Sequence, residues 1–214
     1  MVTYHKIDAP FMRDTKGKIQ IGQWCRPEFE FLANNEWEFT EKVDGTNIRI
    51  HVEWDEKLCI LVYSYGGRTD NAQIPPALTD ALNRVVTKVN DKLTKVMLER
   101  NISSLVIFGE GYGPKINGGG KYIEEPSFVV FDIRVGDVWL TRESVNDLCD
   151  KAGLDMVPVV GVGSLYDGFE LVKNGLQSDW GDFEAEGIVA VPTVPLFNRM
   201  GNRIITKIKS KDFR

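Results

Sequence analysis

A single lysine, Lys42, stands two residues before the Asp of an Asp-Gly pair in residues 41–47, EKVDGTN. Strand-forming runs lie on both sides, at 37–40 and 48–52, so we expect Lys42 where a strand ends and the chain reverses. Such a position can hold an amine at the floor of a pocket. A lysine is nucleophilic only as the free amine, which burial or nearby positive charge favours by lowering the pKa from about 10.4. An ordinary exposed lysine is the commoner meaning of this short pattern, so the chemistry depends on the other stretches.

Two acidic residues stand beside glycines next to apolar runs. Glu110 lies between Gly109 and Gly111 after the run 105–108, and glycines allow a ligand to approach closely. Glu186 precedes Gly187 at the head of the run 188–191. Both carboxylates therefore stand where a strand could present them to a ligand.

Two lysines alternate near the end of the sequence. Residues two apart in a strand point to one face, so Lys207 and Lys209 are predicted to project together, with Ile208 on the other face. Such neighbours repel each other unless a polyanion lies between them. They belong to a basic stretch that also fits a solvated tail, and charge alone does not separate the two readings. Its members are Arg199, Arg203, Lys207, Lys209, Lys211 and Arg214.

Three further stretches carry residues that could contact a ligand. Arg68 follows two glycines, which fits a tight turn that presents a guanidinium and equally a plain surface turn. Phe131 and Asp132 lie in the apolar run 128–133, where an aromatic residue is by default part of the core and an aspartate either caps a turn or faces a site. The glycine-rich residues 113–122 lack the Gly-Lys-Ser/Thr ending of a Walker loop and are predicted to form a flexible loop.

The elements that must position these residues are mixed helices and strands. Apolar residues at spacings of three and four predict an amphipathic helix over about 77–100. Thr141 and Gly153 bound a second helix as its N-cap and its stop. Strands are predicted at 37–40, 48–52, 58–64, 105–108, 128–133, 188–191 and 203–210, with a further strand and helix over 156–171 and mixed loops and short strands in 1–36.

Composition limits the class of protein. The 214 residues make one domain or at most two small ones, and 43% hydrophobic with 27% charged residues is ordinary for a globular protein. The net charge of −5 is not that of a general nucleic-acid binder, so any polyanion contact must come from a local patch. Neither a signal-peptide pattern nor an apolar run of about 20 residues is present. Three scattered cysteines and two separated histidines predict reduced thiols in a cytoplasm and no zinc or histidine metal site.

Taken in order, six stretches resemble the motifs of the covalent nucleotidyltransferases, the superfamily of ATP-dependent DNA and RNA ligases and messenger-RNA capping enzymes. Residues 45–47 and 131–133 resemble the RNA ligases, especially the nick-sealing branch and its compact phage-type members, because the other groups usually carry arginine near the Asn47 position. The six stretches are 41–45, 67–69, 108–111, 128–133, 186–189 and 207–209.

The resemblance implies that Lys42 attacks the α-phosphorus of ATP and becomes a lysyl-adenylate, which then passes to an RNA 5′-phosphate before a 3′-hydroxyl displaces AMP. It implies Mg²⁺ or Mn²⁺ as the metal, with Glu110 and Glu186 as its carboxylates. The other implied contacts are the Glu41 segment and Phe131 with adenine, Asn47 and Arg68 with the phosphate or the RNA end, Glu110 with the ribose, and Lys207 and Lys209 with the phosphates.

The same resemblance implies the fold and the setting. We expect an α+β, ATP-grasp-like ligase adenylation domain with antiparallel sheets around a nucleotide cleft, spanning 1–214 as a single domain without a C-terminal OB or helical domain. The expected partner is RNA, as a nicked duplex or as single-strand ends, in a cytoplasm that for a phage protein is that of the host, with no membrane and no obligatory protein partner. A DNA ligase core, a GTP-dependent capping enzyme and a non-catalytic RNA end-binding module remain the alternatives.

Overall fold

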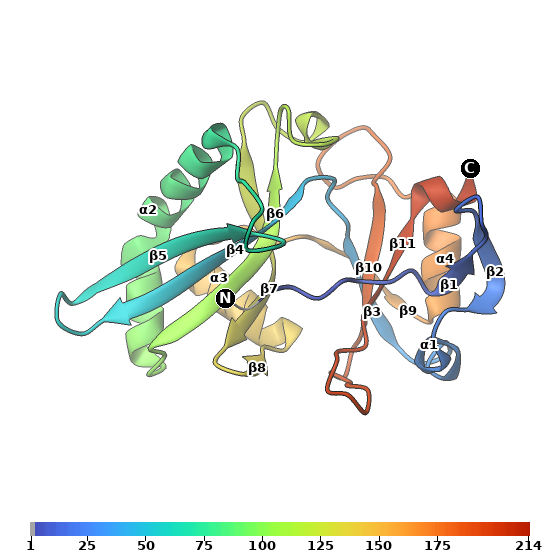
Figure 1. Ribbon diagram of the computed structural model, residues 1–214, viewed down its shortest axis with the longest axis horizontal. Helices are drawn as coiled ribbons and strands as arrows, with labels where there is room; N and C mark the ends of the chain where they lie inside the picture. Colours follow the sequence, from blue (N-terminus) through green and yellow to red (C-terminus); the bar gives the residue numbers. More distant parts are fainter. Residues whose placement is uncertain (1–2) are drawn as a thin grey trace. The chain divides into compact units, whose positions relative to one another are not determined.

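The computed structural model describes residues 3–214, which divide into two compact units (Figure 1). Unit 1 contains residues 44–157 together with the described N-terminal residues 3–5. Unit 2 contains residues 6–43 and 158–214. Every pair of named strands in the described residues is antiparallel, which confirms the predicted α+β class with antiparallel sheets.

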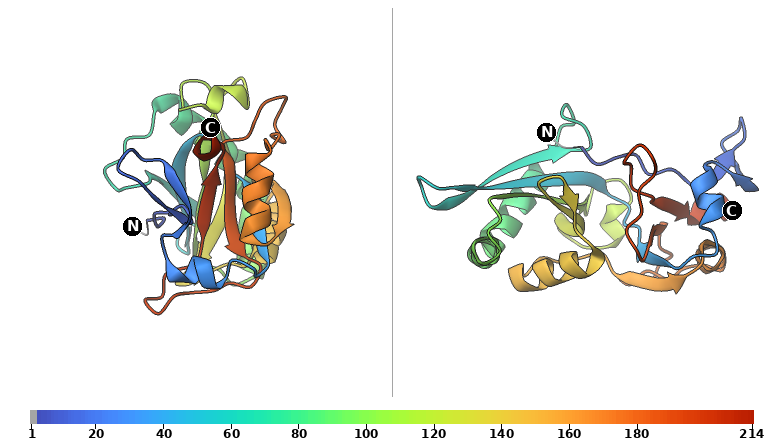
Figure 2. Two further views of the ribbon diagram at one scale, coloured as in Figure 1. Left: turned by 90° about the vertical axis from the view of Figure 1, so that its right-hand side faces the viewer. Right: turned by 90° about the horizontal axis from the view of Figure 1, so that it is seen from below.

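Unit 1 is built on a five-stranded sheet with the order β5-β4-β6-β7-β8. Two helices, α2 (Pro76–Glu99) and α3 (Arg142–Ala152), lie on the same side of this sheet, as the right-hand view of Figure 2 shows. Both helices confirm their predictions, and α3 has Thr141 as N-cap and Gly153 in the left-handed conformation at its end. The strands are β4 (Thr46–Asp55), β5 (Ile60–Gly67), β6 (Ser104–Tyr112), β7 (Ser127–Val135) and β8 (Val138–Trp139), and a short 3₁₀ helix, η1 (Gly119–Lys121), follows β6.

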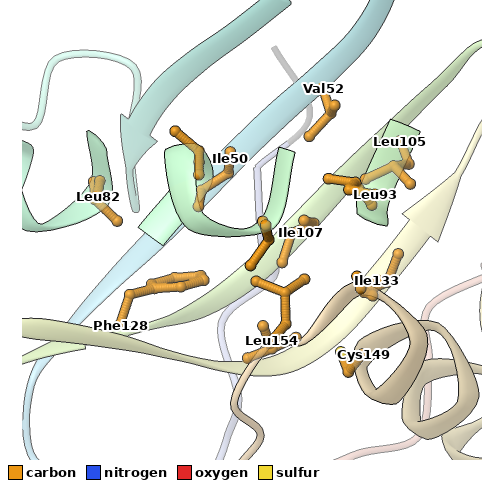
Figure 3. Packing of buried hydrophobic residues seen from close by; sticks show 14 of the residues in the cluster. Ile50, Val52, Leu82, Leu93, Leu105, Ile107, Phe128, Ile133, Cys149 and Leu154 are labelled. Carbon is orange, nitrogen blue, oxygen red and sulfur yellow. The ribbon is translucent and has the colours of Figure 1, made fainter. Parts of the chain in front are cut away.

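The core of unit 1 fills the space between the sheet and the two helices. Alternate residues of the strands point into it, and Leu82 and Leu93 of α2 meet them from the other side (Figure 3). Because burial of an apolar side chain contributes about 1.5–3 kcal/mol, these contacts hold the sheet against the two helices. The opposite face carries polar residues of β4 and β6. Labelled core residues from the strands include Ile50, Val52, Leu105, Ile107, Phe128 and Ile133.

A Leu93→Ala substitution tests this packing. Leu93 is fully buried, so the substitution removes apolar contacts and leaves a cavity. The free energy of unfolding, measured by urea denaturation, is expected to fall by about 2–5 kcal/mol. Leu98 lies on the same helix but is 53% exposed, so Leu98→Ala is the matched control and is expected to change stability by about 0.5 kcal/mol or less. Equal losses in the two variants would contradict the packing described here.

Unit 2 is built on a four-stranded sheet with the order β11-β10-β3-β9. The helix α4 (Leu165–Lys173) packs on one face, where Phe39, Ile188 and Ile208 meet Phe169 in a second core. The predicted strand and helix within 156–171 are thereby confirmed. The remaining elements are β1 (Phe11–Arg13), β2 (Ile19–Trp24), α1 (Pro27–Phe31), β3 (Trp37–Glu41), β9 (Val159–Gly163), β10 (Gly187–Pro192), β11 (Thr206–Lys209) and the 3₁₀ helix η2 (Ser210–Phe213).

The Asp-Gly segment after Lys42 does not form the hairpin that its sequence predicts. The strand before it, β3, pairs with β9 and β10, whereas the strand after it, β4, pairs with β5 and β6. Asp44 and Gly45 therefore link two sheets. Local turn chemistry indicated the end of the strand correctly, but distant strands decide which partners pair.

The helices of residues 3–214 include none that combines the length and the apolar character needed to cross a membrane.

Candidate active site

Lys42 is the first residue after β3, and the neighbouring strand β10 fixes its position. Its backbone N–H donates to the Gly187 carbonyl at 2.9 Å, which extends the β3–β10 ladder by one residue. Its Nζ donates to Glu186 Oε2 at 2.7 Å, and more weakly to the Val43 carbonyl at 3.4 Å. The side chain is 21% exposed. Lys42 is therefore a half-buried lysine held by a carboxylate and not a solvated surface lysine.

Glu186 also binds a second lysine. Lys209 Nζ donates to the other carboxylate oxygen, Oε1, at 2.5 Å. Lys209 lies opposite Gly187 in the register of β10 and β11, so the two strands bring Glu186, Lys42 and Lys209 together at one end of the sheet. We call these three residues the lysine–glutamate cluster.

Lys207 lies on the same face as Lys209. Along β11 the buried residues Thr206 and Ile208 alternate with the half-buried Lys207 and Lys209, which confirms the predicted alternation. Lys207 pairs in register with Val189, one step further along the sheet from the cluster. The open face of this sheet end thus carries three lysines and one carboxylate.

Gly187 allows β10 and β11 to pair closely beside the cluster. Its φ is +145°, and a Cβ there would stand 2.0 Å from the Ile208 carbonyl oxygen. No other residue type fits without moving β11, which carries Lys207 and Lys209. The Glu186-Gly187 pair in the sequence therefore reflects a packing need as well as a carboxylate.

The cluster determines the ionisation of Glu186. Burial raises the pKa of its carboxyl, but the charges of and hydrogen bonds from Lys42 and Lys209 together outweigh burial, and the pKa lies below its ordinary value. At neutral pH Glu186 is an anion between two ammonium groups. It can hold and orient Lys42, but it is a weak base.

A pH titration of stability is expected to show this pairing. The folded-state pKa of Glu186 is depressed, so its contribution to the free energy of unfolding is present above the ordinary glutamate pKa of about 4.3 and is lost as the pH falls through the lower folded value. Urea denaturation between neutral pH and about pH 3 is expected to give a steeper loss for the wild type than for Glu186→Gln, which has no carboxyl to protonate at this position. Parallel curves would contradict the assignment.

Glu41 points away from Lys42, to the buried face of β3. It is 1% exposed; Ser178 Oγ donates to its Oε1 at 2.6 Å and the Asp179 N–H donates to its Oε2 at 2.9 Å. The carboxylate thus fastens the loop that leads from α4 towards Glu186. A ligand contact from the Glu41 segment would therefore involve its backbone atoms and not the Glu41 carboxylate.

The predicted ligand contacts Asn47 and Glu110 are neighbours in unit 1. They lie directly opposite each other in β4 and β6, on the face away from the helices. Gly45 packs against them so closely that a Cβ there would stand 2.8 Å from Glu110 Cγ. Asn47 Oδ1 is buried and accepts no hydrogen bond from the described residues. Because buried polar atoms are normally paired, this oxygen is a candidate ligand contact.

Phe131 is turned out of the core by a β-bulge. The register of β6 and β7 advances from Phe108↔Asp132 to Gly109↔Val130, which leaves Phe131 as the extra residue. Val130 and Ile133 both face the core, so the two residues between them do not. Phe131 is half-buried, and the Tyr4 ring meets it edge-on at 5.0 Å.

The aspartate beside the bulge has a structural partner. Asp132 is 5% exposed, and the Tyr4 hydroxyl donates to its Oδ2 at 2.9 Å. Asp132 lies within β7 and does not cap a turn, whereas the other role, facing a site, stays a prediction. It ties the described N-terminal residues to the sheet beside Phe131.

Arg68 is exposed in the segment after β5, and a residue that the sequence analysis missed holds this segment. Arg49 of β4 is fully buried and forms an ion pair with Asp70. Its guanidinium lies over Gly66, its register partner, where a Cβ would stand 2.6 Å from Nε. The hydrogen bond from Arg49 lowers the pKa of Asp70. The signal available in the sequence was an arginine within the strand-forming run 48–52.

The glycine-rich loop packs on the Asp-Gly segment instead of standing free. Asn117 Nδ2 donates to the Gly45 carbonyl at 2.5 Å, and the Asp44 N–H donates to the Tyr122 hydroxyl at 3.1 Å. Gly118 lies so close that a Cβ would stand 2.1 Å from Asp44 Oδ2. The loop therefore supports the start of β4, where Asn47 lies.

The side chains of the site suit a magnesium-type ion that is coordinated partly by protein carboxylates and partly by nucleotide phosphates. Among residues 3–214 no three His, Cys, Asp or Glu residues form a group that could hold a metal alone. Magnesium usually takes one or two carboxylates and completes its shell with phosphate oxygens and water. A carboxylate has about four acceptor positions, of which the two lysines use two at Glu186. The chain thus fits a metal that arrives with phosphates and does not fit a fully protein-bound ion.

Comparison with protein families identifies the family of this chain. The family model described as RNA ligase matches residues 35–209, which include the lysine–glutamate cluster and all the predicted site residues. The chain belongs to the RNA ligase family. Residues 1–34 and 210–214 lie outside the match.

Solved structures of an RNA ligase share the fold of this family member. Naegleria gruberi RNA ligase with pyrophosphate aligns with a TM-score of 0.64 at 18% identity, covering 98% of this chain and 62% of that one. A single-residue variant of the same ligase with ATP and Mn aligns with a TM-score of 0.64 at 20% identity, covering 87% and 53%. A second variant with ATP and Mn aligns with a TM-score of 0.66 at 16% identity, covering 99% and 57%. The chain thus spans between 53% and 62% of the length of these structures.

Proposed function

We propose that the protein is an ATP-dependent RNA ligase that joins RNA 3′-hydroxyl and 5′-phosphate ends through a lysyl-adenylate on Lys42. The observation that carries this proposal is the lysine–glutamate cluster: a half-buried lysine at a strand end, 2.7 Å from a carboxylate that also binds Lys209. An ordinary surface lysine does not require partial burial and a carboxylate partner, whereas a nucleophilic lysine must be held in a defined position. Membership in the RNA ligase family supports RNA as the partner.

The first step forms a bond between Lys42 Nζ and the α-phosphorus of ATP and breaks the bond from that phosphorus to the pyrophosphate oxygen. An ammonium has no lone pair, so Lys42 must first lose a proton to solvent water, and pyrophosphate leaves with the electron pair of the broken bond. The AMP group then passes to the RNA 5′-phosphate, which frees the lysine. In the last step the 3′-oxygen attacks that 5′-phosphorus, loses its proton and releases AMP.

The polyanionic substrate explains why three lysines share one face. Lys207 and Lys209 would bind phosphate oxygens, where fixed positive charge stabilises the charge that develops during transfer. Glu186 would hold Lys42 in the correct direction until phosphates compete for the lysines. A bound Mg²⁺ or Mn²⁺ would neutralise phosphate charge, with Glu186 and Glu110 as its carboxylates.

We assign the residues of unit 1 to the nucleotide and the RNA end. Glu110 would bind the ribose, Phe131 would stack on adenine together with the Glu41 segment, and Asn47 and Arg68 would bind the phosphate or the RNA end. The unpaired Asn47 oxygen and the outward-turned Phe131 support these roles. We further propose that both units serve this one reaction, as a single adenylation domain.

Transfer of label from nucleotide to protein tests the function. Protein freed of bound adenylate with pyrophosphate is incubated with α-labelled ATP and magnesium, denatured and separated on a gel; we expect label on the protein and, after RNA is added, label on RNA. Label from GTP instead of ATP would indicate a capping enzyme, and passage to DNA ends in place of RNA ends would indicate a DNA ligase. A folded protein that takes no label from either nucleotide would contradict the enzyme and favour a module that binds RNA ends.

A further inference from the structure

The connection between β10 and β11 carries an exposed phenylalanine and basic residues that the proposed reaction does not use. We define residues 193–203 as the tip loop. It extends beyond the ends of the two strands (Figures 1 and 2). Phe197 is 51% exposed and Met200 is 84% exposed. Apolar side chains this large are normally buried, so a cluster of them on a projecting loop is a candidate contact surface.

The tip loop is an ordered hairpin. Its base is held by Thr193, whose N–H donates to the Glu36 carbonyl at 3.1 Å, and by the Ile204 N–H, which donates to the Leu196 carbonyl at 2.9 Å. At its end Asn198 Oδ1 accepts from the N–H groups of Met200 at 3.0 Å and Asn202 at 2.9 Å. The exposed side chains are therefore held outward by the backbone, which lowers the entropy lost on binding.

The charge of the tip loop differs from that of the whole chain. It contains Arg199 and Arg203 and no acidic residue, whereas the chain has a net charge of −5. Phe197 and Arg203 lie opposite each other in an antiparallel bridge, so their side chains project from the same face of the hairpin. An aromatic ring beside a guanidinium is the pair that binds unpaired nucleotides, with a base on the ring and a phosphate on the cation.

We propose that the tip loop is a docking surface for a single-stranded stretch of the RNA substrate, away from the ends that are joined. This inference rests on the proposed function for its choice of RNA. About ten residues separate Gly187, beside the cluster, from Phe197; at ~3.4 Å per strand residue the span is at most about 34 Å. A stacked strand covers that span with about ten nucleotides at ~3.4 Å each. The tip loop therefore affects the binding of long RNA and leaves the chemistry at the ends unchanged.

Substrates of two lengths test the proposal. We would measure RNA affinity by fluorescence anisotropy and sealing rate on RNAs whose single-stranded flank extends either about 5 or about 20 nucleotides from the join, which when stacked cover about half and about twice the 34 Å limit. Phe197→Ala is expected to weaken binding of the long RNA about 5- to 160-fold, which is the range for loss of one stacked base, and to leave the short RNA unchanged. Phe197→Trp, which keeps a stacking ring, is expected to restore binding. Arg199→Glu is expected to weaken long-RNA binding and to reduce its dependence on salt.

Matched controls separate this surface from general effects. Phe31 is 85% exposed at the end of α1, a helix that carries Glu28 and Glu30 and no basic residue, so Phe31→Ala removes an exposed ring from an acidic segment and is expected to change nothing. Lys88→Glu on α2 is the control for Arg199→Glu. Label transfer from ATP to the protein is expected to be unchanged in all variants.

Four results would overturn the proposal. These are equal losses on short and long RNA, no loss in Phe197→Ala, equal loss when the long flank is fully base-paired, and a dimer that Phe197→Ala dissociates without change in RNA affinity. The last would make the loop a contact between two copies of the chain. Anisotropy needs no catalysis, so the inference stays testable if the wild type takes no label from ATP, a result that would count against the proposed function alone.

Discussion

Lys42→Arg is expected to abolish the transfer of label from α-labelled ATP to the protein. Arginine keeps the positive charge and can still pair with Glu186, but its guanidinium stays protonated and offers no nucleophilic amine. The expected signal on a denaturing gel is zero, not a reduced rate, because no other residue replaces the bond-forming atom. Lys57→Arg, at an exposed lysine in the β4–β5 turn, is the matched control and is expected to label like the wild type.

The same variant is expected to retain the last step. RNA that already carries AMP on its 5′-phosphate needs no lysine nucleophile, so Lys42→Arg is expected to seal pre-adenylated RNA at a measurable rate. This activity would also show that the variant is folded. Label on the Lys42→Arg protein, at any residue, would contradict the assignment of the nucleophile.

The sequence was most informative where local patterns agree with the fold. The amphipathic spacing of α2 and the capping of α3 depend on neighbours three or four residues apart, and both helices form as predicted. The alternation of Lys207, Ile208 and Lys209 likewise follows from strand geometry, and β11 follows it. Such features need only the residues of one element.

What the sequence could not supply depends on contacts between distant elements. The Asp-Gly pair after Lys42 resembles a hairpin turn, yet the strands on its two sides choose partners in different sheets. The bulge that turns Phe131 outward arises from the register of β6 and β7, which a run of apolar letters does not reveal. Short-range propensity is outweighed in both places by long-range pairing.

The same distinction between local patterns and long-range contacts applies to the candidate site. The identities of Lys42, Glu186 and Lys209 could be picked out, but their grouping rests on β3, β10 and β11, which lie up to 167 positions apart in the sequence, from Lys42 to Lys209. The buried carboxylate of Glu41, fastened to Ser178, shows the reverse case. It stands next to Lys42 in the chain, yet strand alternation sends it to the opposite face.

Glu186→Gln is expected to slow adenylate transfer by about 10²–10³-fold, comparable to the loss of one fixed oxyanion-hole donor at a reacting centre. The amide keeps nearly the same shape but carries no charge, so Lys42 and Lys209 lose their shared anion and repel each other across it. The single-turnover rate of label transfer at saturating ATP measures the effect.

Glu184→Gln provides the matched control two residues earlier. Glu184 forms an ion pair with Arg214 at the surface and lies outside the lysine–glutamate cluster. Such a surface ion pair is worth up to ~1 kcal/mol of stability and contacts no reacting group. We therefore expect the rate of label transfer to stay within about twofold of the wild type. If both variants slowed equally, the loss at Glu186 would reflect general damage to this segment. If neither slowed, Glu186 would not orient Lys42, and the 2.7 Å contact would be a resting ion pair without a part in the reaction. A large loss confined to Glu186→Gln, measured where urea titration shows both variants to be fully folded, would separate orientation of the nucleophile from stability of the fold.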